Sequence, residues 1–412
     1  METEALEGES EPLNCAICDV ALDNMSPSLR QEHYELHFQD AESHQEAVPS
    51  SPNTTPSDAP SKEQFWTISL APQRKPPSNV TPGLIPILRQ ALLRSHANGK
   101  TQRAALCKDS ICHIASEFLD TTYGCGYRNY MMACSLLYEQ DIIPQYRHNL
   151  DQDGGPSIRQ LQRLIEMAWS DGYDLVGATQ LKNRLVNTKK WIGTADLYTA
   201  FTYRGIPSRL VDFPQSGADP EVLPRWVANY FFPPKSTGNI QSALSGASPV
   251  VQTEKAPLIL QASISHQGHS RTVVGIETNK AGILNLLVFD PAKKIPSNLR
   301  KQALSAFPSP QSPSHSHLRS IASTLKGSGK RPREEDEEDD RHNKKGRPSF
   351  VHIHDNQSKE EIDYIAVLKL FRVPLSNLKK RDKYQILTFP LEPILTQDER
   401  ESRKVVTSEK VF

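Results

Sequence analysis

The chain has 412 residues, of which 48 are Lys or Arg and 48 are Asp or Glu, so its formal net charge is zero. This length predicts two or three domains, or one large domain with tails. No run of about 18 apolar residues occurs, and the N-terminus is acidic and polar, so we expect neither a membrane span nor a signal peptide. Six cysteines exclude a disulfide scaffold and favour an intracellular, reducing compartment.

The neutral total conceals an uneven distribution of charge. Residues 1–50 carry twelve acidic residues and one basic residue, Arg30, so this segment has a net charge of −11 and the remainder carries +11. Hydrophobic residues make up 37% of the chain, below the share of about 45–50% that is usual in globular proteins. We therefore expect disordered segments beside a sizeable core.

Residues 13–40 are predicted to form a small C2H2-type zinc finger. Zn²⁺ takes four Cys or His ligands in a tetrahedron. A helix is expected from Pro27, because Ser26 is a good N-cap and proline suits the first helical position. The alternative is that the four residues are uncoordinated members of an acidic tail. The candidate ligands, spaced C-x2-C and H-x3-H, are Cys15, Cys18, His33 and His37.

The charge of the finger indicates what it binds. A DNA-reading finger needs basic residues to contact phosphates, but residues 13–40 contain one Arg and no Lys, so direct DNA binding is not expected. A protein surface with basic residues around an apolar patch fits better. Ubiquitin presents such a surface, so ubiquitin is the hypothetical partner.

After the finger, a linker and a helix are expected. Residues 43–82 are rich in Pro, Ser and Thr, which is typical of a disordered linker. Residues 83–95 (GLIPILRQALLRS) then place apolar residues at near-helical spacing, and Pro86 suits the first turn. We predict a helical arm over 83–99.

The region from 104 to 300 is predicted to be a mixed α+β domain, because helices are followed by clustered strands. One helix is expected over 126–140, and a second follows Ser157, a good N-cap. Residues 233–256 are interpreted as a surface insertion. Strands are predicted at 258–264, 272–276 and 283–289.

A second break covers 301–349, where seven consecutive acidic residues (334–340) lie between basic clusters. Such a block is typically disordered. Strand-like patterns resume at 362–371 and 384–389, so the α+β domain is predicted to comprise 104–300 and 350–395. The basic clusters favour either a nuclear signal or a solvated run of charge.

Cys125 is the strongest candidate nucleophile. It lies between two glycines directly before the 126–140 helix, and a helix N-terminus stabilises a thiolate. The flanking glycines would let the backbone turn sharply and approach a substrate. The alternative is a structural cysteine in a loop. Cys134, on the apolar face of the helix, is interpreted as a core residue.

A cysteine nucleophile needs a base and a group that orients the base. If Thr278 closes a hairpin turn opposite Ile283, paired residue numbers sum to 561, so Arg271 faces Asp290 and His269 is its diagonal neighbour. His269 and Asp290 are therefore the predicted base and orienting residue, unless they are only a polar pair at a hairpin end. His266 has the opposite parity.

These segments resemble a known family. YGCGYRN, HQGHSRTVVG and LLVFDP are similar to the Cys, His and Asp boxes of cysteine peptidases specific for ubiquitin-fold modifiers, above all the zinc-finger-containing (ZUFSP-type) deubiquitinases. WIGTADL (191–197), LPRWVANYF (223–231) and LKKRDKYQIL (378–387) also resemble that branch. GLIPILRQALL (83–93) resembles the helical segment before the catalytic domain of this family, which implies that the 83–99 arm contacts ubiquitin.

The resemblance implies a papain-like α+β fold in which Cys125 is the nucleophile, His269 the general base and Asp290 its orienting partner. It further implies cleavage after the C-terminal glycine of ubiquitin, a preference for lysine-63-linked chains, and action in the nucleus as well as the cytoplasm. The backbone N–H of Cys125, with His113 or Gln267, is the expected oxyanion donor. The alternatives are a protease for another ubiquitin-like modifier and an inactive ubiquitin-binding scaffold.

Overall fold

The computed structural model describes residues 65–213, 219, 221–232, 248–264, 267–305, 307, 363–378 and 383–411, together with 29 and 33. These residues form a mixed α+β fold, as the sequence predicts. The main sheet has nine strands, with the order β11-β4-β10-β6-β7-β2-β5; β8 pairs with β7, and β9 pairs with β8. Its strands are β2 (Thr101–Leu106), β4 (Arg209–Phe213), β5 (Val250–Gln252), β6 (Leu258–Ile264), β7 (Gln267–Asn279), β8 (Leu284–Phe289), β9 (Arg372–Pro374), β10 (Lys383–Thr388) and β11 (Ser408–Lys410).

The long strand β7 organises this sheet. Along one edge it pairs with β6 through its first half and with β2 through its second half, while β8 occupies the other edge. Only β2–β5 and β4–β11 are parallel among the described pairs. A separate two-stranded sheet pairs β1 (Val80–Thr81) with β3 (His113–Ile114).

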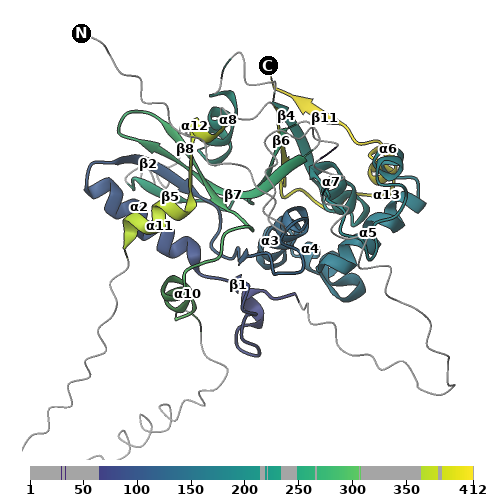
Figure 1. Cartoon of the computed structure of the whole chain (residues 1–412), viewed down its shortest axis with the longest axis horizontal. Coiled ribbons are helices and arrows are strands. Elements are labelled where there is room, and N and C mark those ends of the chain that lie inside the picture. The colour runs from purple at the N-terminus through teal and green to yellow at the C-terminus, as the bar shows by residue number, and fades with distance from the viewer. Residues whose placement is uncertain are drawn as a thin grey trace, which may run out of the picture.

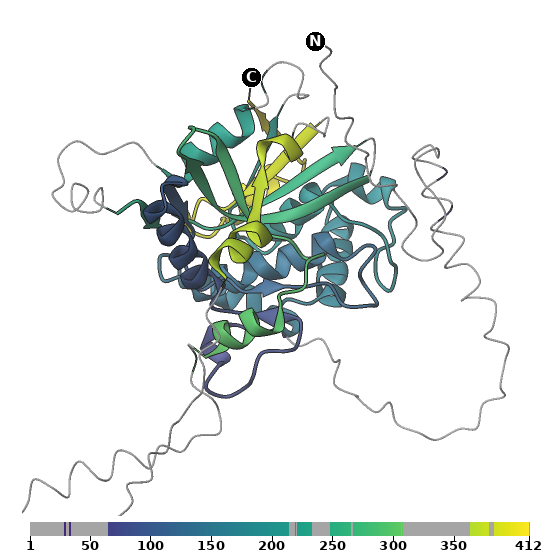
Figure 2. The ribbon, with the colours of Figure 1, turned by 60° about the vertical axis from the view of Figure 1, so that its left-hand side comes forward.

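Helices pack around the sheet, and α3 and α5 lie together in Figure 1. In Figure 2 the blue helices from the first half of the chain gather below the strands. Two helices far apart in sequence, α2 and α11, lie side by side. The α-helices are α2 (Leu84–Ala97), α3 (Cys125–Glu139), α4 (Gln145–Asp151), α5 (Ile158–Ser170), α6 (Leu175–Gln180), α7 (Thr194–Tyr203), α8 (Val222–Phe231), α10 (Ser297–Leu304), α11 (Tyr364–Phe371), α12 (Leu375–Leu378) and α13 (Gln397–Ser402).

Local sequence signals explain the helices nearest the site. Ser157 caps α5, since its hydroxyl accepts a hydrogen bond from the Gln160 N–H at 3.2 Å. The sequence predicts one apolar face for α3, but every residue from Gly126 to Leu137 is buried. A helix buried on all sides belongs to the interior, so α3 is a fixed support for whatever its first residue carries.

The linker and arm predictions need correction. Residues 43–64 lie outside the described residues, but 65–82 are folded onto the domain. Trp66 is 1% exposed and its Nε1 donates to the Arg74 carbonyl at 2.8 Å. The predicted helix over 83–99 is present as α2, but most of its apolar residues, including Leu84 and Leu88, are buried in the domain's own core. That apolar face is therefore not free to contact ubiquitin.

The segment after the charged block also differs from its prediction. Residues 363–371 contain helix α11 rather than a strand, because Asp363 caps it by accepting from the Ile365 and Ala366 N–H groups at 2.9 and 3.2 Å. Its β-branched and aromatic residues favour strands, but the spacing of the buried positions is helical. The sheet also extends beyond 395, through β11, and β5 falls inside the predicted surface insertion.

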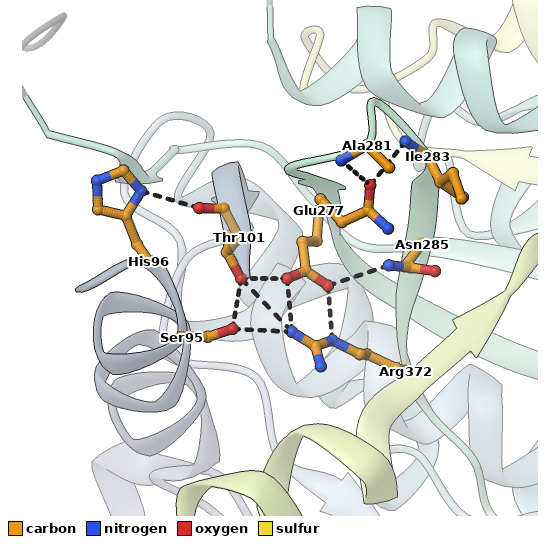
Figure 3. Close-up of polar contacts among 9 residues, drawn as sticks. Ser95, His96, Thr101, Glu277, Ala281, Ile283, Asn285 and Arg372 are labelled. Carbon is orange, nitrogen blue, oxygen red and sulfur yellow. Dashed lines mark hydrogen bonds and ion pairs between the residues drawn. The ribbon is translucent and has the colours of Figure 1, made fainter. Parts of the chain in front are cut away.

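A buried ion pair fastens the late segment to the sheet. The Glu277 carboxylate on β7 is 0% exposed and accepts from Nε and Nη2 of Arg372 on β9, both at 2.6 Å. Thr101 and Asn285 also donate to this carboxylate, and Ser95 of α2 joins the same cluster. Figure 3 shows these side chains converging in one cluster, and they come from α2, β2, β7, β8 and β9. The chain thus returns to the same sheet after residue 363.

None of the helices among the described residues has the length and apolar character needed to cross a bilayer.

Candidate active site

Cys125 is the first residue of α3. The cap residue Gly124 makes no side-chain cap bond, so the first N–H groups of the helix are available to a negative charge. Cys125 is partly exposed, whereas the helix behind it is buried. The helix therefore holds this thiol at the surface in a position that favours its ionised form.

The two glycines beside Cys125 are required by close packing rather than by a left-handed turn. A Cβ at Gly124 would lie 2.2 Å from Oδ2 of Asp120, and a Cβ at Gly126 would lie 2.5 Å from the carbonyl oxygen of Ile192. The predicted sharp turn is therefore not the reason for the glycines. Neighbouring segments approach the start of α3 so closely that no side chain fits.

An ion pair braces the turn before the nucleophile. Arg128 donates from Nε to Oδ2 of Asp120 at 2.8 Å and from Nη2 to Oδ1 at 3.0 Å, and both side chains are 2% or 3% exposed. The Asp120 carbonyl oxygen also accepts from the Gly124 N–H at 2.6 Å. The pair thus ties the loop to the first turn of α3.

The β7–β8 hairpin brings His269 to Asp290. Near the turn the register differs from the prediction, because Thr278 pairs with Leu284 rather than Ile283. The register then shifts between Val273 and Gly275, so that Thr272 pairs with Phe289, whose numbers have the predicted sum. As a result, Asp290 accepts from His269 Nε2 and from Arg271 Nε, each at 2.7 Å.

A buried asparagine joins the helix to this strand. Asn129 is 0% exposed, donates from Nδ2 to the Ser270 hydroxyl at 2.9 Å and accepts from the Thr272 hydroxyl at 2.7 Å. It lies one helical turn after Cys125, and both hydroxyls belong to β7, the strand that carries His269. Sequence reasoning missed it, although an amide among the apolar residues of α3 was a visible signal.

The charges of the three groups support one another. Burial opposes ionisation of Cys125, but the hydrogen bond and charge of His269, with hydrogen bonds from Ser270, lower the pKa of the thiol. Burial would lower the pKa of His269, but Asp290 and Cys125 raise it to about 9. Burial likewise disfavours ionised Asp290, whose pKa is nevertheless lowered by His269 and Arg271. Each of the three groups therefore favours the charged form of its neighbour, which is a thiolate at Cys125, an imidazolium at His269 and a carboxylate at Asp290.

A family model supplies the context for this arrangement. The model of peptidase family C78 matches residues 100–320, which is more than half of the 412 residues and includes Cys125, His269 and Asp290. The chain belongs to peptidase family C78.

Relatives of this C78 peptidase carry informative names. Zinc finger-containing ubiquitin peptidase 1 of Mus musculus is 40% identical over 206 residues, which are 49% of this chain and 33% of the mouse protein. The Homo sapiens protein of that name is 38% identical over the same shares. Ubiquitin carboxyl-terminal hydrolase mug105 of Schizosaccharomyces pombe is 30% identical over 175 residues, 42% of this chain and 61% of that protein. The match therefore spans about a third of the two mammalian relatives.

The other described cysteines of this C78 peptidase contrast with Cys125. Cys107, Cys112 and Cys134 are each 0% exposed, and burial raises the pKa of each thiol well above its ordinary value. A buried, protonated thiol is a poor nucleophile. Among the four described cysteines, only Cys125 combines exposure with a lowered pKa.

Of the two side chains expected as oxyanion donors, His113 is placed differently from the prediction. His113 is 1% exposed and its Nε2 lies 3.0 Å from the carbonyl oxygen of Asp290, so it supports the strand end behind the carboxylate. Burial lowers the pKa of His113 to about 4, which keeps it neutral. His266 and the side chain of Gln267 lie outside the described residues. The main-chain N–H of Cys125 therefore stays the predicted donor.

The predicted zinc ligands lie almost entirely outside the described residues. Of the four, only His33 is described, and it lies in a helix, as the sequence predicts for that part of the finger. Within the described part of the chain, no group of three or more His, Cys, Asp or Glu residues is arranged to hold a metal ion. The zinc site at Cys15, Cys18, His33 and His37 thus stays a prediction, and no step of the chemistry below involves it.

Proposed function

We propose that the chain is a deubiquitinase, a cysteine protease that cleaves isopeptide bonds after the C-terminal glycine of ubiquitin. The observation that carries this proposal is the thiol at the start of α3 facing an imidazole that a buried carboxylate holds. Cys125 is the proposed nucleophile, His269 the general acid and base, and Asp290 its orienting partner. The names of the relatives support ubiquitin as the substrate.

In the first half of the reaction, the Cys125 thiolate attacks the carbonyl carbon of the terminal glycine. The carbon–sulfur bond forms, and the bond to the lysine side-chain nitrogen breaks. The Nε2 atom of His269 is occupied by Asp290, so Nδ1 faces the thiol and gives its proton to the departing amine. A thioester and a free lysine result.

In the second half, water replaces the amine. The now neutral His269 removes a proton from the water as its oxygen attacks the thioester carbon, and the carbon–sulfur bond breaks. Ubiquitin leaves with a free terminal carboxyl group, and the thiolate–imidazolium pair is restored. The N–H groups of the first turn of α3, with that of Cys125, are the proposed donors to the developing oxyanion.

Asp290 keeps the imidazole in its working orientation. Its carboxylate is 5% exposed and shares its two oxygens between His269 and Arg271. Arg271 thereby fixes the carboxylate while leaving one oxygen for the imidazole. The pair orients the ring and stabilises the imidazolium, as in other cysteine and serine hydrolases with a third group behind the histidine.

The finer properties follow from the resemblance and from the relatives' names. We propose a papain-like arrangement of the domain, a Zn²⁺-bound finger over 13–40 that holds additional ubiquitin, and action on lysine-63-linked chains in the nucleus and cytoplasm. A tethered finger would raise the effective concentration of a chain at the active site. A preference among linkages would then come from geometry.

Turnover of linkage-defined chains by the full-length protein tests the proposal. We expect the wild type to cleave lysine-63-linked tetraubiquitin, Cys125→Ala to lose cleavage by at least a thousandfold, and the matched Cys134→Ala on the same helix to retain it. Undiminished cleavage by Cys125→Ala refutes the assignment. Cleavage of another ubiquitin-like modifier alone supports a protease for that modifier, and no cleavage of any modifier supports an inactive scaffold.

A further inference from the structure

The loop before the nucleophile exposes two adjacent apolar side chains. Phe118 is 94% exposed and Leu119 is 78% exposed, and Phe118 is the most exposed large apolar residue in the described part of the chain. Single exposed apolar residues are common on protein surfaces. Here two neighbouring residues, six and seven positions before the nucleophile, together form an apolar surface. Its contact with water is unfavourable, and a binding partner that covers it would remove that free-energy cost.

This apolar pair cannot turn inward, because the loop is fixed on both sides of it. The Glu117 N–H donates to Oδ1 of Asp120 at 2.8 Å, and the Asp120 N–H donates to the Glu117 carbonyl at 3.1 Å. The Thr121 hydroxyl also donates to the Glu117 carbonyl, at 2.7 Å. Phe118 and Leu119 are thus held at the tip of a turn whose base is bonded to itself.

The loop begins beside the carboxylate of the site. The Ser116 N–H donates to the carbonyl of Pro291 at 2.8 Å, and Pro291 directly follows Asp290. The loop then runs from the His269–Asp290 side of the site to Cys125. In the proposed reaction, His269 gives its proton to the departing lysine amine, so the protein that carries this lysine lies on the same side.

We infer that Phe118 and Leu119 form a docking surface for the protein that carries the departing lysine, which in polyubiquitin is the ubiquitin unit released with a free lysine. The inference rests on the proposed function. An apolar pair suits the apolar patch of ubiquitin. Beside it, the Glu117 carboxylate is 53% exposed, although Arg128 lies 3.5 Å away, and this charge suits the basic residues around that patch.

The test compares two substrates that share ubiquitin and differ in the leaving group. One releases a small fluorophore from the ubiquitin C-terminus, and the other is lysine-63-linked diubiquitin. For the double variant Phe118→Ser/Leu119→Ser, we expect the ratio of kcat/KM on diubiquitin to kcat/KM on the fluorogenic substrate to fall at least tenfold, through KM. The control is Ile365→Ser/Val405→Ser, which changes two apolar residues that are 68% and 73% exposed elsewhere.

Each other outcome contradicts the inference. If kcat/KM falls on neither substrate, the Phe118–Leu119 pair is not a docking surface. If kcat/KM falls equally on both substrates, the pair contacts the ubiquitin that forms the thioester. Self-association of the wild type in sedimentation, lost in the double variant with an unchanged ratio, identifies a second copy of the chain as the occupant. If the wild type cleaves neither substrate, the proposed function itself is refuted, and the inference falls with it.

Discussion

Replacing Asn129 with alanine tests whether the helix and the strand must be joined for the nucleophile to work. Asn129 makes two side-chain hydrogen bonds from α3 to β7 near the site, to Ser270 and Thr272. Neither of these hydrogen bonds involves a proposed reacting atom. We therefore interpret it as a positioning residue that sets the separation of Cys125 from His269.

The expected size of the effect follows from these bonds. Ser270 is 3% exposed and Thr272 is 0% exposed, so the variant leaves two buried hydroxyls without their partner. Each unsatisfied buried group costs about 1–3 kcal/mol, and because hydroxyls can rotate to other acceptors we expect the free energy of unfolding to fall by about 2–4 kcal/mol. A misplacement of about 1 Å in an active site can cost about a hundredfold in rate, which is the expected loss in kcat.

The assay measures kcat on a fluorogenic ubiquitin substrate and denaturant unfolding on the same preparations. Asn149→Ala is the matched control, because Asn149 also donates a hydrogen bond, to the Arg204 carbonyl at 2.8 Å, away from the site. It should lose stability but less than threefold in kcat. If Asn129→Ala loses the expected stability yet keeps kcat within twofold of the wild type, the cross-link does not position the nucleophile.

Three further predictions test the electrostatics and the packing. In Asp290→Asn the pKa of His269, which Asp290 and Cys125 raise to about 9, should fall. The alkaline limb of the pH–kcat profile should therefore move at least one pH unit lower, and an unmoved limb argues against the His269–Asp290 pair. Arg372→Leu should lower the free energy of unfolding by about 3–5 kcal/mol, because it leaves the buried Glu277 carboxylate unpaired, and the double variant with Glu277→Leu should recover at least half of that loss in urea unfolding. Gly126→Ala should cost about 1–3 kcal/mol of stability and reduce kcat, since its Cβ would lie 2.5 Å from a main-chain oxygen; wild-type stability and rate would show that the neighbouring segment moves freely.

The sequence predicts much of the strand pattern and the pairing of His269 with Asp290, but for a partly different reason. A simple hairpin with paired numbers summing to 561 places the two residues on one face. In the structure the turn is closed by an Asn279–Ile283 backbone bond, one step out of that register, and a shift between Val273 and Gly275 restores it at the site. Gly275 stands at this shift, and an isolated glycine within a strand is a signal of a bulge or of close backbone approach, which the simple hairpin count does not include.

Tertiary contacts account for what the sequence does not predict. Asn129 and Asp120 act through partners that are 141 and 8 residues away, so their roles appear only when the elements are packed. The helix at α11 shows a competition between signals, because the strand preference of its residues is outweighed by the Asp363 cap and by burial against α2. The helix α2 is predicted correctly as a helix and placed wrongly, since periodicity does not reveal which surface covers an apolar face.

The most direct test of the central claim is the site of covalent reaction with ubiquitin. Full-length protein is incubated with ubiquitin propargylamide, and the product is analysed by intact mass and peptide mapping. We predict one adduct per chain, on Cys125, which is retained in Cys134→Ala and absent in Cys125→Ala. An adduct on another cysteine, or no adduct with correctly folded wild-type protein, contradicts the claim that Cys125 is the nucleophile of a ubiquitin-cleaving enzyme.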